Sequence, residues 1–133
     1  MNTFTIIKRF STSVSTNLKV AVLGSGWSSF SFLRLIDKDL FHVNVISPRN
    51  HFLFTPLLPS ASVGTLEFRC IQEPVRTIPN IEYHQAEATH VDFKGKTIDC
   101  EEIFTKSKFT IDYDILLICT GSSFDKSIEM KDR

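Results

Sequence analysis

The first regular pattern in the chain is a compact apolar run at residues 19–23, which ends in the turn Gly24-Ser25-Gly26. Residues 28–36 then place apolar side chains at helical spacing, and residues 42–46 form a second apolar run that stops at Ser47-Pro48. A short apolar run without alternation is typical of a strand buried on both faces of a parallel sheet. Strand, glycine turn, helix and strand in this order predict one right-handed βαβ unit.

Residues 49–79 break this pattern, because their apolar positions neither alternate nor repeat at helical spacing. Prolines recur through the segment, and a proline removes a backbone donor and fixes its own φ angle. We expect a long ordered loop that contains one short helix. So long a loop in a small domain is uncommon and usually functional.

The remainder of the chain predicts further strands. Residues 81–88 are expected to form a third strand, and residues 89–93 and 96–100 flank Lys94-Gly95 as in a β-hairpin. Residues 113–119 are predicted to form a fully buried strand that ends at Thr120-Gly121. The fold class is therefore α/β, a parallel sheet with an inserted β-hairpin or meander.

Composition narrows the functional classes. The 133 residues suffice for one domain, and the 15 Lys and Arg residues balance the 15 Asp and Glu residues. Nucleic-acid binding through phosphate contacts usually requires a basic excess, so we expect no nucleic-acid partner. No uncharged apolar run approaches the ~18 residues of a transmembrane helix, so none is expected.

Cysteine and histidine spacing argues against metal and dithiol chemistry. Cys70, Cys100 and Cys119 lie far apart and form no C-x-x-C pair, and the four histidines form no cluster at metal-ligand spacing. We therefore expect neither a zinc site nor a redox-active cysteine pair.

Residues 1–18 are rich in hydroxyl side chains, contain Lys8 and Arg9, and have no acidic residue. On a helix, Ile6, Phe10 and Val14 would share one face opposite the two cations. This pattern predicts a mitochondrial targeting segment, and a disordered polar tail is the alternative. Residues 125–133 are expected to form a charged, exposed tail.

The turn from Gly24 to Ser29 provides two glycines of the pattern G-x-G-x-x-G, with Ser29 in the third position. The first glycine permits a tight turn, and the second lets backbone N–H groups approach a pyrophosphate at the helix N-terminus. Because the turn follows a buried strand and opens a helix, it predicts dinucleotide binding. A plain strand-to-helix turn remains the alternative.

One expected feature of a dinucleotide site is missing, because no carboxylate follows the second strand. Ser47 stands in that region, followed by Pro48 and Arg49. The serine hydroxyl can bind a ribose, and Arg49 can lie against adenine, a phosphate or the 2′-phosphate of NADP. Arg49 as a solvated loop cation is the alternative.

Four stretches give a more specific indication: GSGW at 24–27, SPRN-x-FLFTPLLPS at 47–60, VGTLE at 63–67 and EPVR at 73–76. With them, residues 19–78 resemble the N-terminal flavin-binding segment of type II (alternative, rotenone-insensitive) NADH dehydrogenases. The similarity is greatest to mitochondrial members, and it continues more loosely through residues 83–88 and 113–121.

The resemblance implies a flavoprotein attached peripherally to the mitochondrial inner membrane, which passes electrons from NADH through FAD to ubiquinone without pumping protons. It implies that residues 19–124 form an incomplete Rossmann-like FAD/NAD(P)-binding domain. No catalytic acid, base or nucleophile is expected, because the flavin supplies the redox chemistry. The implied FAD contacts are Gly24, Ser25, Gly26 and Trp27 at the pyrophosphate, Ser47 and Arg49 at the adenosine, Thr55, Pro56, Leu57 and Leu58 beside the isoalloxazine, Ala88 at the adenine, and Thr120 with Gly121 near the pyrophosphate.

Local features leave two points open. Phe52, Phe54, Leu57 and Leu58 can equally be core side chains. No second G-x-G-x-x-G follows Gly26, so the NADH-binding domain of the family is expected to be absent, and the sheet is expected to expose core to solvent or a protein partner. The chain is then the FAD-binding part of an oxidoreductase, a truncated, non-catalytic accessory subunit of a respiratory assembly, or a free nucleotide-binding module.

Overall fold

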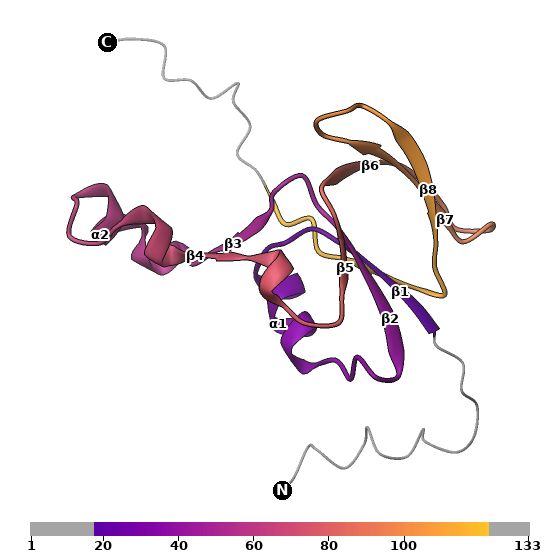
Figure 1. Cartoon of the computed structure of the whole chain (residues 1–133), viewed down its shortest axis with the longest axis horizontal. Coiled ribbons are helices and arrows are strands. Elements are labelled where there is room, and N and C mark those ends of the chain that lie inside the picture. The colour runs from indigo at the N-terminus through magenta and orange to yellow at the C-terminus, as the bar shows by residue number, and fades with distance from the viewer. Residues whose placement is uncertain (1–17, 123–133) are drawn as a thin grey trace, which may run out of the picture.

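A four-stranded parallel sheet in the order β5-β2-β1-β9 forms the centre of the fold (Figure 1). The structure is a computed structural model that describes residues 18–122. Its two middle strands are β1 (Leu18–Leu23) and β2 (Phe41–Ile46), and α1 (Trp27–Leu35) connects them. The edge strands are β5 (Glu82–His84) and β9 (Ile115–Ile118). The predicted βαβ unit is confirmed.

The sheet separates two cores, because successive side chains of a strand point to opposite faces. Val20 and Val22 of β1 face α1 and pack against Leu33 of that helix. The same core contains Val43 and Val45 of β2, and Val75 and Ile78 from the segment that begins with the 3-10 helix η5 (Val75–Thr77).

The opposite face of the sheet packs against a three-stranded antiparallel sheet, β6 (Ala86–Asp92), β7 (Thr97–Glu102) and β8 (Lys108–Asp112). Ala21 and Leu23 of β1 meet Ile98 and Cys100 of β7 there. The hairpin predicted around Lys94-Gly95 is confirmed, and β8, which the pattern did not predict, completes this second sheet.

The predicted single strand at residues 81–88 is wrong, because the chain changes sheets at Gln85. β5 pairs with β2 in the parallel sheet, whereas β6 pairs with β7 in the antiparallel sheet. The Gln85 carbonyl accepts a hydrogen bond from the Ile103 N–H at 3.1 Å, and its side-chain amide donates to the Pro48 carbonyl at 3.3 Å. These bonds hold Gln85 as the corner between the two sheets.

The predicted loop at residues 49–79 contains more structure than expected. β3 (His51–Leu53) pairs antiparallel with β4 (Gln72–Pro74), and between them lie η3 (Thr55–Leu57), α2 (Leu58–Ser62) and η4 (Phe68–Ile71). We call residues 51–74 the arm, because they project from the two sheets with α2 near the tip (Figure 1). Strands of three residues give no readable alternation, so the sequence did not reveal this pairing.

The prediction that residues 113–119 form a fully buried strand is also wrong. β9 is an edge strand, with Ile115 45% and Ile118 61% exposed. Its apolar sequence resembles that of a central strand, but among the described residues β9 pairs with β1 alone. Residues 1–17 and 123–133, which contain almost all of the predicted targeting segment and the charged tail, lie outside the described residues. Within residues 18–122, no helix has the length and hydropathy needed to cross a membrane.

Candidate functional site

The glycine turn lies where the carboxyl ends of β1, β2 and β9 meet. The Gly24 N–H donates to the Ile46 carbonyl at 2.8 Å, and the Cys119 N–H donates to the Leu23 carbonyl at 2.8 Å. Gly24 has a φ of +104°, and a Cβ atom there would collide with the Cys119 carbonyl. The fold itself therefore requires glycine at this position.

Gly26 is different, because nothing in residues 18–122 requires it to be glycine. Its φ is −83°, which any residue adopts, and a Cβ atom there would meet no atom of these residues within 4 Å apart from its own chain neighbours. Gly26 is also the N-cap of α1, where no side chain caps the helix and no acidic residue occupies the first turn. The first backbone N–H groups of α1 therefore face open space with their positive dipole end uncompensated.

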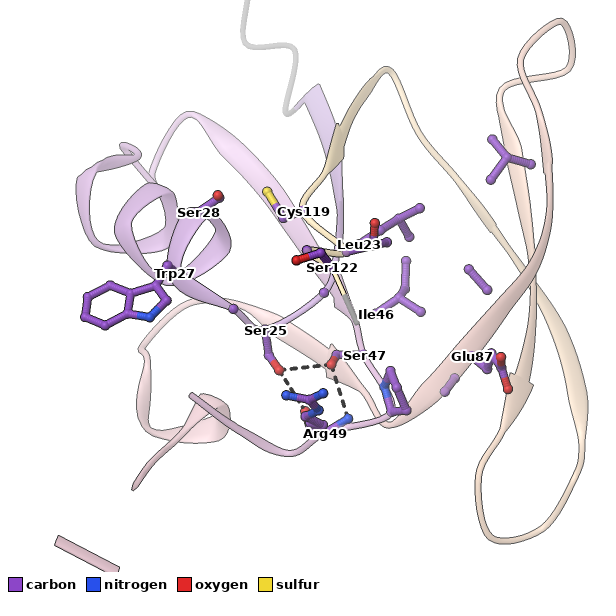
Figure 2. Close-up of a pocket in the computed structure, with 18 of the residues that line it drawn as sticks. Leu23, Ser25, Trp27, Ser28, Ile46, Ser47, Arg49, Glu87, Cys119 and Ser122 are labelled. Atoms are coloured by element: carbon purple, nitrogen blue, oxygen red, sulfur yellow. Dashed lines mark hydrogen bonds between the residues drawn. The ribbon is translucent and has the colours of Figure 1, made fainter. Parts of the chain in front are cut away.

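Two buried serines connect this turn to the segment that follows β2. The Ser25 and Ser47 hydroxyls lie 3.0 Å apart, and the Arg49 N–H donates to Ser47 Oγ at 3.2 Å. Ser25 Oγ also lies 3.2 Å from the Arg49 carbonyl (Figure 2). The His51 carbonyl lies 3.3 Å from the same hydroxyl, so either carbonyl can accept its proton. Ser47 thus occupies the position of the usual carboxylate, as an uncharged group already held by hydrogen bonds.

These elements border a cleft of about 950 Å³, close to the upper end of the usual range for ligand sites. Trp27 lies at one end and Glu87 at the other, with Ser25 and Ser47 between them (Figure 2). Its charged or titratable lining residues include Arg49, Glu87 and His90. Among residues 18–122, no group of histidine, cysteine or acidic side chains could hold a metal ion.

One wall of the cleft is an edge strand, which sequence reasoning did not identify beyond Ala88. In the part of the chain that the structure describes, β6 pairs with β7 alone, so the backbone on its other side has no ladder partner there. Residues 86–91 line the cleft. A register shift between Ala88 and His90 leaves Thr89 as an extra residue in the pairing. Such a bulge bends an edge strand locally. The backbone N–H and C=O groups on this side of β6 are therefore available to a ligand in the cleft.

Most residues predicted from the sequence meet at this cleft. It is lined by Gly24, Ser25, Gly26, Trp27, Ser47, Arg49, Thr55, Ala88, Thr120 and Gly121. Pro56 and Leu57 do not line it; they follow Thr55 in η3 on the arm, where Leu57 is partly exposed. Of the four side chains that could have been core, Phe52 is buried, whereas Phe54, Leu57 and Leu58 are about one-third exposed or slightly more.

Several lining residues were not predicted as site residues from the sequence, among them Pro48, His51, Phe93, Cys119 and Ser122. Burial raises the pKa of the Cys119 thiol, which keeps it protonated at neutral pH. All three cysteines lie within the described residues and are free. Ser29, in the third position of the glycine pattern, is fully buried, and its hydroxyl has no hydrogen-bond partner among the described residues.

Comparison with known proteins gives a consistent family. Residues 18–131 match the family model described as "Pyridine nucleotide-disulphide oxidoreductase". A probable NADH dehydrogenase of Dictyostelium discoideum is 47% identical over 113 residues, which are 82% of this chain and 25% of that protein. The external alternative NAD(P)H-ubiquinone oxidoreductase B4, mitochondrial, of Arabidopsis thaliana is 45% identical over 78% of this chain and 19% of its own length.

A solved structure shows the same arrangement. NDH2 from Plasmodium falciparum, solved in complex with NADH, matches with a TM-score of 0.78 and 38% identity. The match covers 84% of this chain and 24% of that chain, so the present chain spans a quarter or less of the relatives described here. Because the family model covers most of its length, the chain belongs to the pyridine nucleotide-disulphide oxidoreductase family, and its homologues are type II, or alternative, NAD(P)H-ubiquinone oxidoreductases.

Proposed function

We propose that this chain is the FAD-binding part of a non-proton-pumping NADH:ubiquinone oxidoreductase. The observation that carries the proposal is the open position at Gly26. The fold requires the glycine at position 24 but not the one at 26, and the latter clears space in front of the uncapped N-terminus of α1. A bound diphosphate explains both features, because it needs close backbone approach and a positive helix end.

The pyrophosphate of FAD would lie against the turn from Gly24 to Trp27, with Thr120 and Gly121 on its other side. These residues converge on the same part of the cleft from β1, α1 and the end of β9. The backbone N–H groups there would donate to phosphate oxygens, so binding needs no lysine or arginine at this point.

The adenosine end would lie between the segment after β2 and the edge of β6. Ser47 would face the ribose as an acceptor, and the Arg49 guanidinium would lie beside adenine or a phosphate. The backbone at Ala88 would bind the edge of the adenine, because β6 has no strand on that side. Because no carboxylate directly follows β2, the 2′-phosphate of NADP is an acceptable alternative at this end.

The isoalloxazine end would lie toward Trp27 and Thr55, with Pro56 and Leu57 of the arm beside it. When bound, FAD would supply the chemistry that accepts a hydride and passes electrons onward. The chain's own part is to hold and orient the cofactor and to exclude water with apolar side chains at this end. NADH and ubiquinone would be the substrates, as the names of the relatives indicate for those proteins.

The chain matches a quarter or less of the relatives described above, so we propose that the reaction with NADH also involves parts of such an enzyme that this match does not include. The exposed apolar side chains of β9 and the arm favour another protein surface that covers them. That surface would belong either to the rest of such an enzyme or to a respiratory assembly that holds the chain as an accessory subunit. Several relatives are named as mitochondrial, which together with residues 1–18 supports a location on the mitochondrial inner-membrane surface.

Reconstitution tests this proposal. The purified chain would be mixed with FAD and with the part of the Dictyostelium relative that the match leaves out, and NADH oxidation by a soluble ubiquinone analogue would be followed. Quinone-dependent oxidation that requires both polypeptides supports the oxidoreductase part. Tight FAD binding without activity in any mixture would favour the accessory subunit, and a folded chain that binds no FAD would overturn both.

A further inference from the structure

The arm has almost no core of its own. Phe52 and Ile71 are buried at its base, but no residue from Leu53 to Cys70 is buried. Beyond the β3–β4 pairing at the base, where the Phe54 N–H also donates to the Ile71 carbonyl at 2.8 Å, its internal hydrogen bonds are local, such as the Thr65 N–H to the Ser60 carbonyl at 3.1 Å. The position of the arm relative to the cleft therefore depends on the few contacts that connect its base to the sheets.

Trp27 provides such a contact and is also part of the glycine turn. Its indole N–H donates to Thr55 Oγ1 at 3.2 Å, where the arm leaves β3. Its ring meets Phe52 edge-on with centroids 4.9 Å apart and lies 5.2 Å from the Phe54 ring in a tilted arrangement. One side chain therefore contacts three successive parts of the arm base.

The contact continues into the body of the fold. The Phe52 ring stacks on the Phe30 ring of α1, with centroids 4.1 Å apart and planes 7° apart. The Arg34 guanidinium lies over the Phe30 ring, 5.1 Å from its centroid. α1 thus holds Phe52 through Phe30, and it holds Thr55 through Trp27. The aromatic stack fixes the base of the arm. Within residues 18–122, the Trp27 indole N–H is the one group that hydrogen-bonds the Thr55 hydroxyl at the beginning of η3.

We propose that Trp27 is a positioning residue, which holds Thr55 and the arm in place beside one end of the cleft through its indole N–H. This inference rests on the proposed function, because both Trp27 and Thr55 line the cleft at the end assigned to the isoalloxazine. Glu87, at the end proposed for the adenosine, lies beyond Ser25 and Ser47, away from Trp27 (Figure 2). Loss of the hydrogen bond should therefore weaken binding of the flavin half of FAD and leave binding of the adenosine half unchanged.

The experiment compares FAD with ADP, which has the adenosine and diphosphate but no flavin. In Thr55→Val we expect FAD affinity to fall about fivefold, the usual value of one hydrogen bond, and ADP affinity to be unchanged. Trp27→Phe, which keeps a ring but loses the N–H, should lower FAD affinity by the same factor. Thr55→Ser keeps the acceptor and should restore FAD affinity. Thr65→Val is the matched control on the arm, since no hydrogen bond of its side chain occurs among the described residues.

A double-variant cycle separates positioning from direct contact with the flavin. If the two side chains act through one bond, Trp27→Phe combined with Thr55→Val should lose no more FAD affinity than either change alone. Chymotrypsin should also cut the arm faster in both single variants without ligand. Additive losses of FAD affinity, or equal losses for FAD and ADP, would overturn the proposal. If the wild-type chain bound neither ligand, the proposed function would fail, and the ligand-free proteolysis would still decide whether Trp27 holds the arm.

Discussion

The carbonyl oxygen of Cys119 occupies the space that a Cβ atom on Gly24 would need. This contact joins the end of β9 to the turn after β1, so the first glycine of the pattern is a requirement of the fold. The second glycine, Gly26, has no such neighbour. Gly24 is therefore needed for folding and Gly26 for the proposed ligand, so substitutions at the two positions should affect stability and binding separately.

Gly24→Ala should lower the free energy of unfolding by about 2 to 3 kcal/mol, because the new methyl group meets a backbone atom and the φ of +104° is strained for alanine. Chemical denaturation followed by circular dichroism measures this loss. Gly121→Ala is the control, because Gly121 has a φ of +69° but open space at its Cβ position. It should cost about 1 kcal/mol, from backbone strain alone. Equal losses in both variants would show that the Cys119 contact is unimportant.

Ser29→Ala should stabilise the protein by about 1 kcal/mol, because it removes a buried hydroxyl without a hydrogen-bond partner and adds a better helix former. Thermal unfolding measures the change. Ser28→Ala, at an exposed position of the same turn, should shift stability by less than about 0.5 kcal/mol. A destabilised Ser29→Ala protein would mean that the hydroxyl has a partner that contributes to folding.

Ser47→Ala should weaken binding of FAD and ADP alike, because Ser47 lies at the proposed adenosine end and both ligands contain adenosine. The loss of one hydrogen bond corresponds to about a fivefold to tenfold drop in affinity. Calorimetric titration of both ligands measures it. A loss confined to FAD would contradict the proposed direction of the ligand in the cleft, since Thr55→Val is the variant expected to behave in that way.

Cys100 should make the protein less stable at high pH. Burial, and secondarily the nearby Asp99 carboxylate, raise the pKa of its thiol from 9.0 to about 11. The folded state therefore holds this proton more tightly than the unfolded state, so stability is complete below pH 9 and declines as the pH rises toward 11. The decline attributable to Cys100 should reach about 2 kcal/mol.

Denaturation curves across this pH range test the assignment to Cys100. The decline should become shallower in Cys100→Ala, although that variant begins less stable because a buried sulfur is lost. Cys70→Ala, at an exposed thiol, should keep the wild-type slope. An unchanged slope in Cys100→Ala would assign the pH dependence to other groups, such as Tyr83, whose pKa burial also raises.

The sequence predicted those parts of the fold that depend on local pattern. Two apolar runs and a glycine turn are enough to define β1, α1 and β2, because burial on both sheet faces leaves a continuous apolar signal. β9 carries the same signal, yet its exposure depends on what lies beside it in space. The local pattern therefore predicted the strand correctly and its burial incorrectly.

The candidate site was predictable where a residue type has a direct chemical reason. The glycines, Ser47 and Arg49 were found in this way, and all of them line the cleft. The role of the β6 backbone could not be predicted in this way, because the free N–H and C=O groups of an edge strand do not depend on its side chains. The hydrogen bond from Trp27 to Thr55 was also invisible, since it depends on how the arm returns toward α1.

The most direct test of the FAD site is a calorimetric titration of FAD into the wild-type chain and into Gly26→Asp. Aspartate is a favourable N-cap, so this variant should unfold at the same temperature as the wild type or higher, stabilised by up to about 1 kcal/mol. Its side chain would nevertheless fill the open space at Gly26 with negative charge. We predict one FAD bound per wild-type chain and no detectable binding to the variant. Equal FAD binding by both proteins, or none by a well-folded wild type, would contradict the account.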